Sequence, residues 1–298
     1  MNAPTRLALF GAALLVAFGV AFGIARVAVP DSVVRAWTDS SRSPGTHDDH
    51  DDHGAPPATA PVAGTSLSAD GYILGPVSAP GHVGEPGTLS FRIDDPRGTP
   101  LTSYATEHEQ DLHLIVVRSD GARFRHVHPS LDAATGVWSL PWTWDAAGTY
   151  RVFADFVPGG HDTSPLTLSR TVTVAGEVTP WRGEPSRIAQ VDGLTVTLTG
   201  DLPVGHQGTL TATVTRDGTP VTTLQPYLGA FGHLVALREG DLAYLHVHPH
   251  GDTPGPGATG GPEIAFSASA PTAGRYLLYL DFQLDGAVHT AAFVVDAA

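Results

Sequence analysis

The sequence predicts an all-β protein: two tandem immunoglobulin-like antiparallel β-sandwich domains after an N-terminal transmembrane helix and a disordered linker. Three observations lead to this prediction. From residue 69 onward, short runs rich in Val, Thr, Leu, Tyr and Phe are separated by turn signals such as D-G and P-G, without a long 3.6-residue periodicity. This part of the chain contains a long internal repeat. One uninterrupted apolar segment precedes it.

The apolar segment, residues 7–25, is flanked by Arg6 and Arg26. As a helix it would span roughly 28 Å, close to the thickness of the hydrocarbon core of a bilayer. We expect an uncleaved anchor over residues 7–29, with residues 1–6 in the cytoplasm. The alternative is a cleaved signal peptide, since the segment is N-terminal and has a short basic start. With the N-terminus inside, the protein is a single-pass component of the cell membrane whose C-terminal domains are extracytoplasmic.

Residues 30–67 are predicted to form a disordered linker rich in His, Asp, Pro and Ala, because they offer little apolar surface to bury. The linker contains the run HDDHDDH, with histidines at His47, His50 and His53. Short histidine-rich tracts often bind metal. This run is therefore a candidate weak metal site or, alternatively, a solvated acidic spacer.

The composition limits the chemistry of the chain. There is no cysteine, and the one methionine is the first residue, so soft sulfur ligands for Cu(I) are absent from the folded part. Imidazole and carboxylate ligands remain, and these suit Zn(II), Cu(II) and Ni(II). The formal net charge is −14, which disfavours binding to nucleic acid and favours cations.

The internal repeat defines two predicted domains, residues 68–178 and 184–298. The segment GEPGTL at residues 84–89 matches GHQGTL at residues 205–210, and AGTYRVFADF at residues 147–156 matches AGRYLLYLDF later in the chain. Each copy has room for about seven short strands, as in an immunoglobulin-like sandwich.

A tyrosine in each repeat supports a Greek-key sandwich. Tyr150 and Tyr276 each follow a G-x dipeptide at the start of a late strand, which resembles a tyrosine corner. Alternate residues from each tyrosine should then point into the core. These residues are Tyr150, Val152, Ala154 and Phe156 in repeat 1, and Tyr276, Leu278, Leu280 and Phe282 in repeat 2.

A histidine pattern occurs in both repeats. The first copy reads DLHLIVVRSDGARFRHVHP and the second reads FGHLVALREGDLAYLHVHP. Each of the three histidines in the second copy lies 120 residues after its partner in the first copy. Two-residue hairpin turns at Asp120-Gly121 and Gly240-Asp241 would place all three imidazoles of a copy on one face of a hairpin. The candidate metal ligands are His113, His126 and His128 in repeat 1, and His233, His246 and His248 in repeat 2.

Three imidazoles leave one coordination position vacant. Water could fill it, and so could Asp155 or Asp281 in the matching D-F dipeptides of the late strand. His108 and Glu109 have no counterpart in repeat 2 and are expected to be solvated loop residues.

The HVHP motif with its upstream histidine, followed by GTYRVFADF, resembles bacterial membrane-anchored or secreted proteins that carry two β-sandwich repeats. These proteins are usually called hypothetical or heavy-metal-binding. The resemblance covers most of residues 84–175 and, more weakly, 205–295. It implies an extracytoplasmic β-sandwich with a role in metal handling, and it supplies no catalytic residue.

Three classes of function remain open. The first is a membrane-tethered module that binds a divalent metal ion, Cu(II) or Zn(II). The second is a structural or partner-binding pair of sandwiches with core histidines, for which an envelope protein is a conceivable partner and clustered histidines could act as a pH switch. The third is a three-histidine zinc hydrolase or hydratase. The third is the least supported, because no nucleophile motif occurs and no general base is placed identically in both copies.

Overall fold

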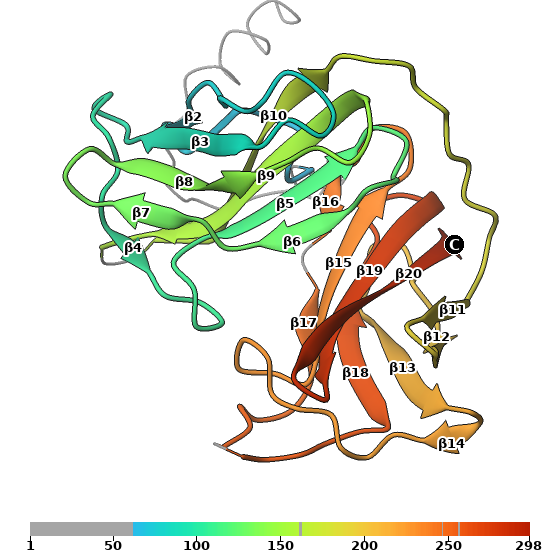
Figure 1. Ribbon diagram of the computed structural model, residues 1–298. Coiled ribbons are helices and arrows are strands. Elements are labelled where there is room, and N and C mark those ends of the chain that lie inside the picture. The colour runs from blue at the N-terminus through green and yellow to red at the C-terminus, as the bar shows by residue number, and fades with distance from the viewer. Residues whose placement is uncertain (1–61, 161–162, 246, 256) are drawn as a thin grey trace, which may run out of the picture. The chain divides into compact units, whose positions relative to one another are not determined.

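The computed structural model describes residues 62–160, 163–245, 247–255 and 257–298. This part of the chain contains β-strands and no helix, which confirms the all-β prediction for it (Figure 1). Accordingly, none of the described segments is a helix long and apolar enough to cross a membrane. The predicted anchor over residues 7–29 lies outside the described residues, as do His47, His50 and His53 of the predicted linker.

Repeat 1 consists of two antiparallel sheets. One has the strand order β1-β2-β3-β8-β7 and the other the order β10-β9-β5-β6, with the short strand β4 paired to β9. The strands are β1 (Ser68–Ala69), β2 (Tyr72–Leu74), β3 (Gly87–Asp94), β4 (Tyr104–Ala105), β5 (His113–Arg118), β6 (Arg125–Val127), β7 (Ser130–Asp132), β8 (Val137–Trp142), β9 (Gly148–Pro158) and β10 (Leu166–Val174).

Repeat 2 has the same two sheets and differs in where its short strand β14 pairs. Its sheets have the orders β11-β12-β13-β18-β17 and β16-β15-β19-β20, with β14 paired to β13. The strands are β11 (Ile188–Val191), β12 (Leu194–Gly200), β13 (Gly208–Arg216), β14 (Thr219–Pro220), β15 (His233–Arg238), β16 (Tyr244–Leu245), β17 (His248–Pro249), β18 (Glu263–Ala268), β19 (Gly274–Leu284) and β20 (Ala287–Ala297).

Each repeat has its own apolar core between its two sheets, and the predicted inward-facing positions after Tyr150 and Tyr276 belong to these cores. The Tyr150 hydroxyl donates to the carbonyl oxygen of Ala146 at 2.8 Å, and the Tyr276 hydroxyl donates to that of Thr272 at 2.8 Å. This backward hydrogen bond is the tyrosine corner expected of Greek-key sandwiches.

A third apolar cluster, which we call the seam, joins the two repeats. Strand β5 is buried at all six positions because one face packs in the core of repeat 1 and the other against repeat 2. The aromatic contacts are reciprocal: the ring of Phe124 stacks on Tyr279 with centroids 4.0 Å apart, and Phe153 contacts Tyr244 at 5.9 Å. The buried seam residues are Ile115, Val117, Phe153, Val235, Leu237, Leu242, Leu277, Tyr279 and Val294, with Phe124 and Tyr244 packed against them.

The predicted linker extends too far at its C-terminal end. Within residues 62–67, the carbonyl oxygen of Ala63 accepts a hydrogen bond from the Tyr244 backbone, and that of Gly64 accepts one from the Ser169 hydroxyl at 2.7 Å. Composition does not reveal these contacts, because the segment is held to the folded repeats by hydrogen bonds to its backbone carbonyl oxygens, and these do not depend on side-chain polarity.

The predicted hairpin registers are correct, although the turns are longer than expected. Ile115 pairs with His126, and Leu237 pairs with Tyr244. The carboxylates of Asp120 and Asp241 organise the longer loops. Asp120 accepts from the backbone N–H of Ala122 and pairs with Arg118. Asp241 accepts from the backbone N–H of Ala243 and pairs with Arg238. In repeat 1 the Arg118 N–H donates to the carbonyl oxygen of Ala122 at 2.9 Å, and Arg123 takes a left-handed φ of 58°.

Candidate metal centre

The three histidines of repeat 1 converge on one point at the seam. His113 begins β5, His126 lies opposite Ile115 in β6, and His128 follows β6, so alternation along both strands places all three on the seam face. One ring nitrogen from each lies within 4.8 Å of those of the other two, an arrangement that could hold a metal ion. We call these three residues the histidine triad.

The separations between the nitrogens suit a tetrahedral metal. His113 Nδ1 lies 3.0 Å from His126 Nε2 and 3.2 Å from His128 Nε2. Two nitrogens bound to one ion at about 2.0–2.1 Å in tetrahedral geometry are about 3.3 Å apart. Both separations therefore need to widen only slightly to fit such an ion.

Hydrogen bonds behind the rings fix two tautomers. His113 Nε2 lies 3.2 Å from the carbonyl oxygen of Glu107, and His126 Nδ1 lies 2.9 Å from Asp281 Oδ2. Both partners accept, so the outer nitrogens carry the protons, and in the neutral rings the inner nitrogens present lone pairs. Two lone pairs then face each other across 3.0 Å, a contact that is repulsive unless a cation lies between them.

The rings of His113 and His128 do not supply that cation by protonation at neutral pH. Burial, reinforced by the nearby His126 and His128 rings, lowers the pKa of His113 to about 3. Burial, again reinforced by His126, lowers the pKa of His128 to about 4. Both rings are therefore neutral near pH 7, which is the form that ligates a metal.

Asp281 reaches the triad from the other repeat. It lies in β19, pairs with His233, and is only 3% exposed. Its Oδ1 accepts from the Thr290 hydroxyl at 2.6 Å, which leaves Oδ2 for His126. The structure thus places Asp281 behind a candidate ligand rather than in the vacant coordination position considered from sequence. A carboxylate behind a histidine orients the ring and makes it a stronger ligand.

The second copy is described in part. His233 is 8% exposed, and its Nε2 donates to the Tyr227 carbonyl oxygen at 2.8 Å, as His113 does to Glu107. Asp155 matches Asp281, and its carboxylate accepts from Thr167 at 2.7 Å and Tyr244 at 3.3 Å. His246 lies outside the described residues, and His248 is described only as part of β17, which pairs with β18.

His108 is an exposed turn residue, as expected, and its ring also lies near histidines of both repeats. The His108 ring, although exposed, is 5.1 Å from the ring of His233 and 6.1 Å from that of His113, measured between centroids. No periodicity signals this position, since it lies in a turn. The available signal was its place five residues before a predicted ligand.

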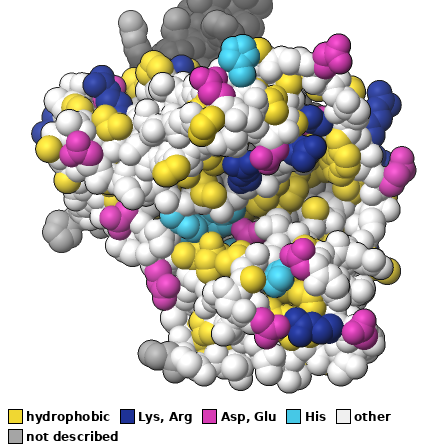
Figure 2. Space-filling model, viewed as in Figure 1, with side chains coloured by type: hydrophobic (Ala, Val, Ile, Leu, Met, Phe, Trp, Pro, Cys, Tyr) yellow, Lys and Arg dark blue, Asp and Glu magenta, His cyan; other side chains and the backbone are white. Residues whose placement is uncertain are grey.

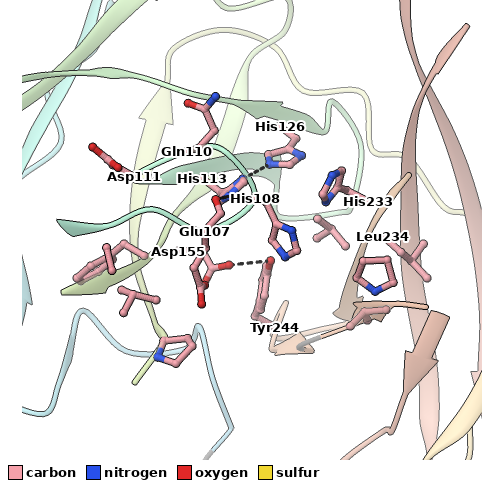
Figure 3. A pocket seen from close by; sticks show the side chains of 17 residues that line it. Glu107, His108, Gln110, Asp111, His113, His126, Asp155, His233, Leu234 and Tyr244 are labelled. Carbon is pink, nitrogen blue, oxygen red and sulfur yellow. Dashed lines mark hydrogen bonds between the residues drawn. The ribbon is translucent and has the colours of Figure 1, made fainter. Parts of the chain in front are cut away.

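Histidines of both repeats line one cavity of about 130 Å³ (Figure 3). His108, His113, His126 and His233 line it together with Asp155, and Tyr244 of repeat 2 lines it beside Asp155. In the space-filling view, histidine side chains lie in a hollow beside hydrophobic and acidic ones (Figure 2). The volume is sufficient for several water molecules, so an ion at the triad could also bind water or a small ligand.

The chain belongs to the family described as a domain of unknown function (DUF8832), whose model matches it twice, over residues 67–176 and 189–298. A search of curated proteins found no match. Among solved structures, it is similar to domains 4 and 5 of the S-layer protein SbsC, at 13% identity and a TM-score of 0.23, covering 71% of this chain and 81% of that one. It is also similar to the Yersinia pseudotuberculosis adhesin InvE, at 14% identity and a TM-score of 0.22, covering 77% of this chain and 60% of that one.

Proposed function

We propose that this protein is a membrane-tethered, extracytoplasmic module that binds a divalent transition-metal ion, Cu(II) or Zn(II), at the histidine triad. The observation that carries the proposal is the convergence of three ring nitrogens within 4.8 Å of one another. The rings of His113 and His126 are held from behind by Glu107 and Asp281 so that their inner nitrogens lie 3.0 Å apart. A fold that merely buried histidines would gain by turning one of these nitrogens toward a donor.

The choice of metal follows from the ligands. Three imidazole nitrogens with no thiolate or thioether available favour Zn(II), Cu(II) or Ni(II) over Cu(I). The buried Asp281 supplies a negative charge that offsets part of the charge of the ion. Copper or zinc handling is accordingly the assignment that we propose.

The cellular setting rests on sequence alone. The apolar segment at residues 7–25, continued to residue 29, would anchor the chain, and the acidic HDDHDDH run would gather cations near the folded part. The matching histidines at His233, His246 and His248 extend the proposal to a site in repeat 2, with Asp155 in the place that Asp281 takes for repeat 1.

Isothermal titration of the untagged, metal-free full chain with Cu(II), Zn(II) and Ni(II) tests the proposal. The comparison variant is His126→Ala/His128→Ala. The control is His82→Ala/His206→Ala, which removes two exposed histidines elsewhere in the chain. We expect tight binding that the control retains and the triad variant loses for at least one ion. Equal binding by all three proteins would reject the triad as the site.

A further inference from the structure

The turn before β5 presents a histidine to the other repeat. Glu107 and Gln110 exchange two backbone hydrogen bonds at 2.9 Å, and the two residues between them, His108 and Glu109, take left-handed φ values of 47° and 63°. Non-glycine residues rarely adopt this conformation, and such strained positions concentrate at functional sites. The turn directs the His108 ring toward the ring of His233.

The internal repeat shows that this histidine is not needed for the turn. In repeat 2, Tyr227 and Ala230 form the same pair of hydrogen bonds, and the matching central residues are Leu228 and Gly229, with φ values of 53° and 74°. Leu228 is buried at 6% exposure, whereas His108 is exposed. A leucine therefore satisfies the backbone, and the imidazole of His108 must be explained by what it contacts.

The ring spacing between His108 and His233 matches the ring spacings within the triad. The three ring pairs of the triad have centroids 4.9–5.2 Å apart with interplanar angles between 38° and 83°. The rings of His108 and His233 are 5.1 Å apart at 76°, within both ranges. Since His233 Nε2 donates to Tyr227, its Nδ1 presents a lone pair, as His113 Nδ1 does in the triad.

From these relationships we infer that His108 and His233 are ligands of a second divalent cation, bound beside the triad and shared between the two repeats. The inference rests on the proposed function, and it adds a ligand from repeat 1 to the site of repeat 2. Water can complete the coordination. The two ions would lie close together because His108 contacts both His113 and His233.

Copper titration followed by electron paramagnetic resonance tests the inference on the full chain. The informative variant is His108→Leu, which copies Leu228 at the matching turn position and so preserves the fold. His206→Leu, at an exposed histidine elsewhere, is the control. We expect wild type and control to bind two Cu(II) ions tightly, with dipolar broadening between them, and His108→Leu to bind one tightly without broadening; weak binding by the HDDHDDH run is common to all three proteins.

The outcomes separate the two proposals. Two ions with unchanged broadening in His108→Leu would overturn the role of His108. One ion in the wild type, lost in His126→Ala/His128→Ala and retained in His108→Leu, would overturn the second site and leave the triad intact. No binding by the wild type would overturn both proposals.

Discussion

His126 of repeat 1 donates its Nδ1 proton to Asp281 of repeat 2 across 2.9 Å, and both side chains are 4% exposed. The ligand-forming nitrogen of His126 is therefore oriented by a residue 155 positions further along the chain. A site encoded by one repeat is completed by the other. The reciprocal aromatic contacts at the seam hold the two repeats in the arrangement that this requires.

Removing the charge of Asp281 should weaken metal binding. We expect Asp281→Asn to lower the affinity of the triad by about 10–100-fold, the usual effect of losing a carboxylate behind a metal-bound histidine. The measurement is titration with Zn(II). Asp285→Asn is the control, because Asp285 is exposed and pairs with Arg216 away from the triad. An unchanged affinity in Asp281→Asn would show that Asp281 has no influence on the site.

The metal-free protein should lose stability as pH falls below about 6.5. The folded-state pKa of His113 is about 3 and that of His128 about 4, both lowered mainly by burial, against an ordinary value near 6.5. Below 6.5 the unfolded chain binds protons that the folded chain does not, so each residue reduces the free energy of unfolding by up to about 1.4 kcal/mol per pH unit. The loss continues until the pH reaches the folded-state pKa.

Urea unfolding between pH 7.5 and 4.5 measures this dependence. We expect His113→Gln, which can still donate to the Glu107 carbonyl, to show a shallower decline than the wild type. The exposed-site variant His206→Gln should decline as the wild type does. Parallel curves for all three proteins would mean that His113 titrates normally in the fold.

Metal should stabilise the fold by an amount that rises with the logarithm of the free ion concentration above its Kd. Free ion at 100 times its Kd adds about 2.7 kcal/mol to the free energy of unfolding if it binds the folded chain alone. Thermal denaturation with Zn(II), before and after addition of a chelator, is the measurement. The increase in Tm should be reversed by the chelator and be smaller in His126→Ala/His128→Ala. A Tm that neither metal nor chelator changes would favour a purely structural role for the histidines.

The seam should contribute strongly to stability. Tyr279 is 4% exposed, stacks on Phe124, and donates to the carbonyl oxygen of Gly121 at 2.5 Å. We expect Tyr279→Ala to cost about 3–5 kcal/mol through the cavity that it leaves. Tyr279→Phe keeps the ring and should cost about 1–3 kcal/mol through the unpaired acceptor. Chemical denaturation of the two variants checks the order, and equal costs would mean that ring packing contributes little.

The sequence predicted the parts of this protein that depend on local pattern. Alternation after Tyr150 and Tyr276 predicted the inward faces of the late strands, and the turn signal at Asp120-Gly121 predicted the register that pairs Ile115 with His126. These features follow from the two-residue period of a strand, which is visible along the chain.

The parts that were missed depend on how the repeats pack. The sequence did not assign Asp281 to His126 or His108 to His233, because these pairs join residues of different repeats and no local period relates them. A clue was present in β5, where Leu114 and Ile115 point to opposite faces and are both fully buried. A strand that is apolar on both faces indicates a covering layer on each side.

An anomalous difference map from crystals of the full chain grown with Zn(II), measured on both sides of the zinc absorption edge, tests metal binding at the triad most directly. We expect a peak about 2.0–2.1 Å from His113 Nδ1, His126 Nε2 and His128 Nε2. Peaks confined to exposed histidines such as His206, with none at the triad, would contradict it.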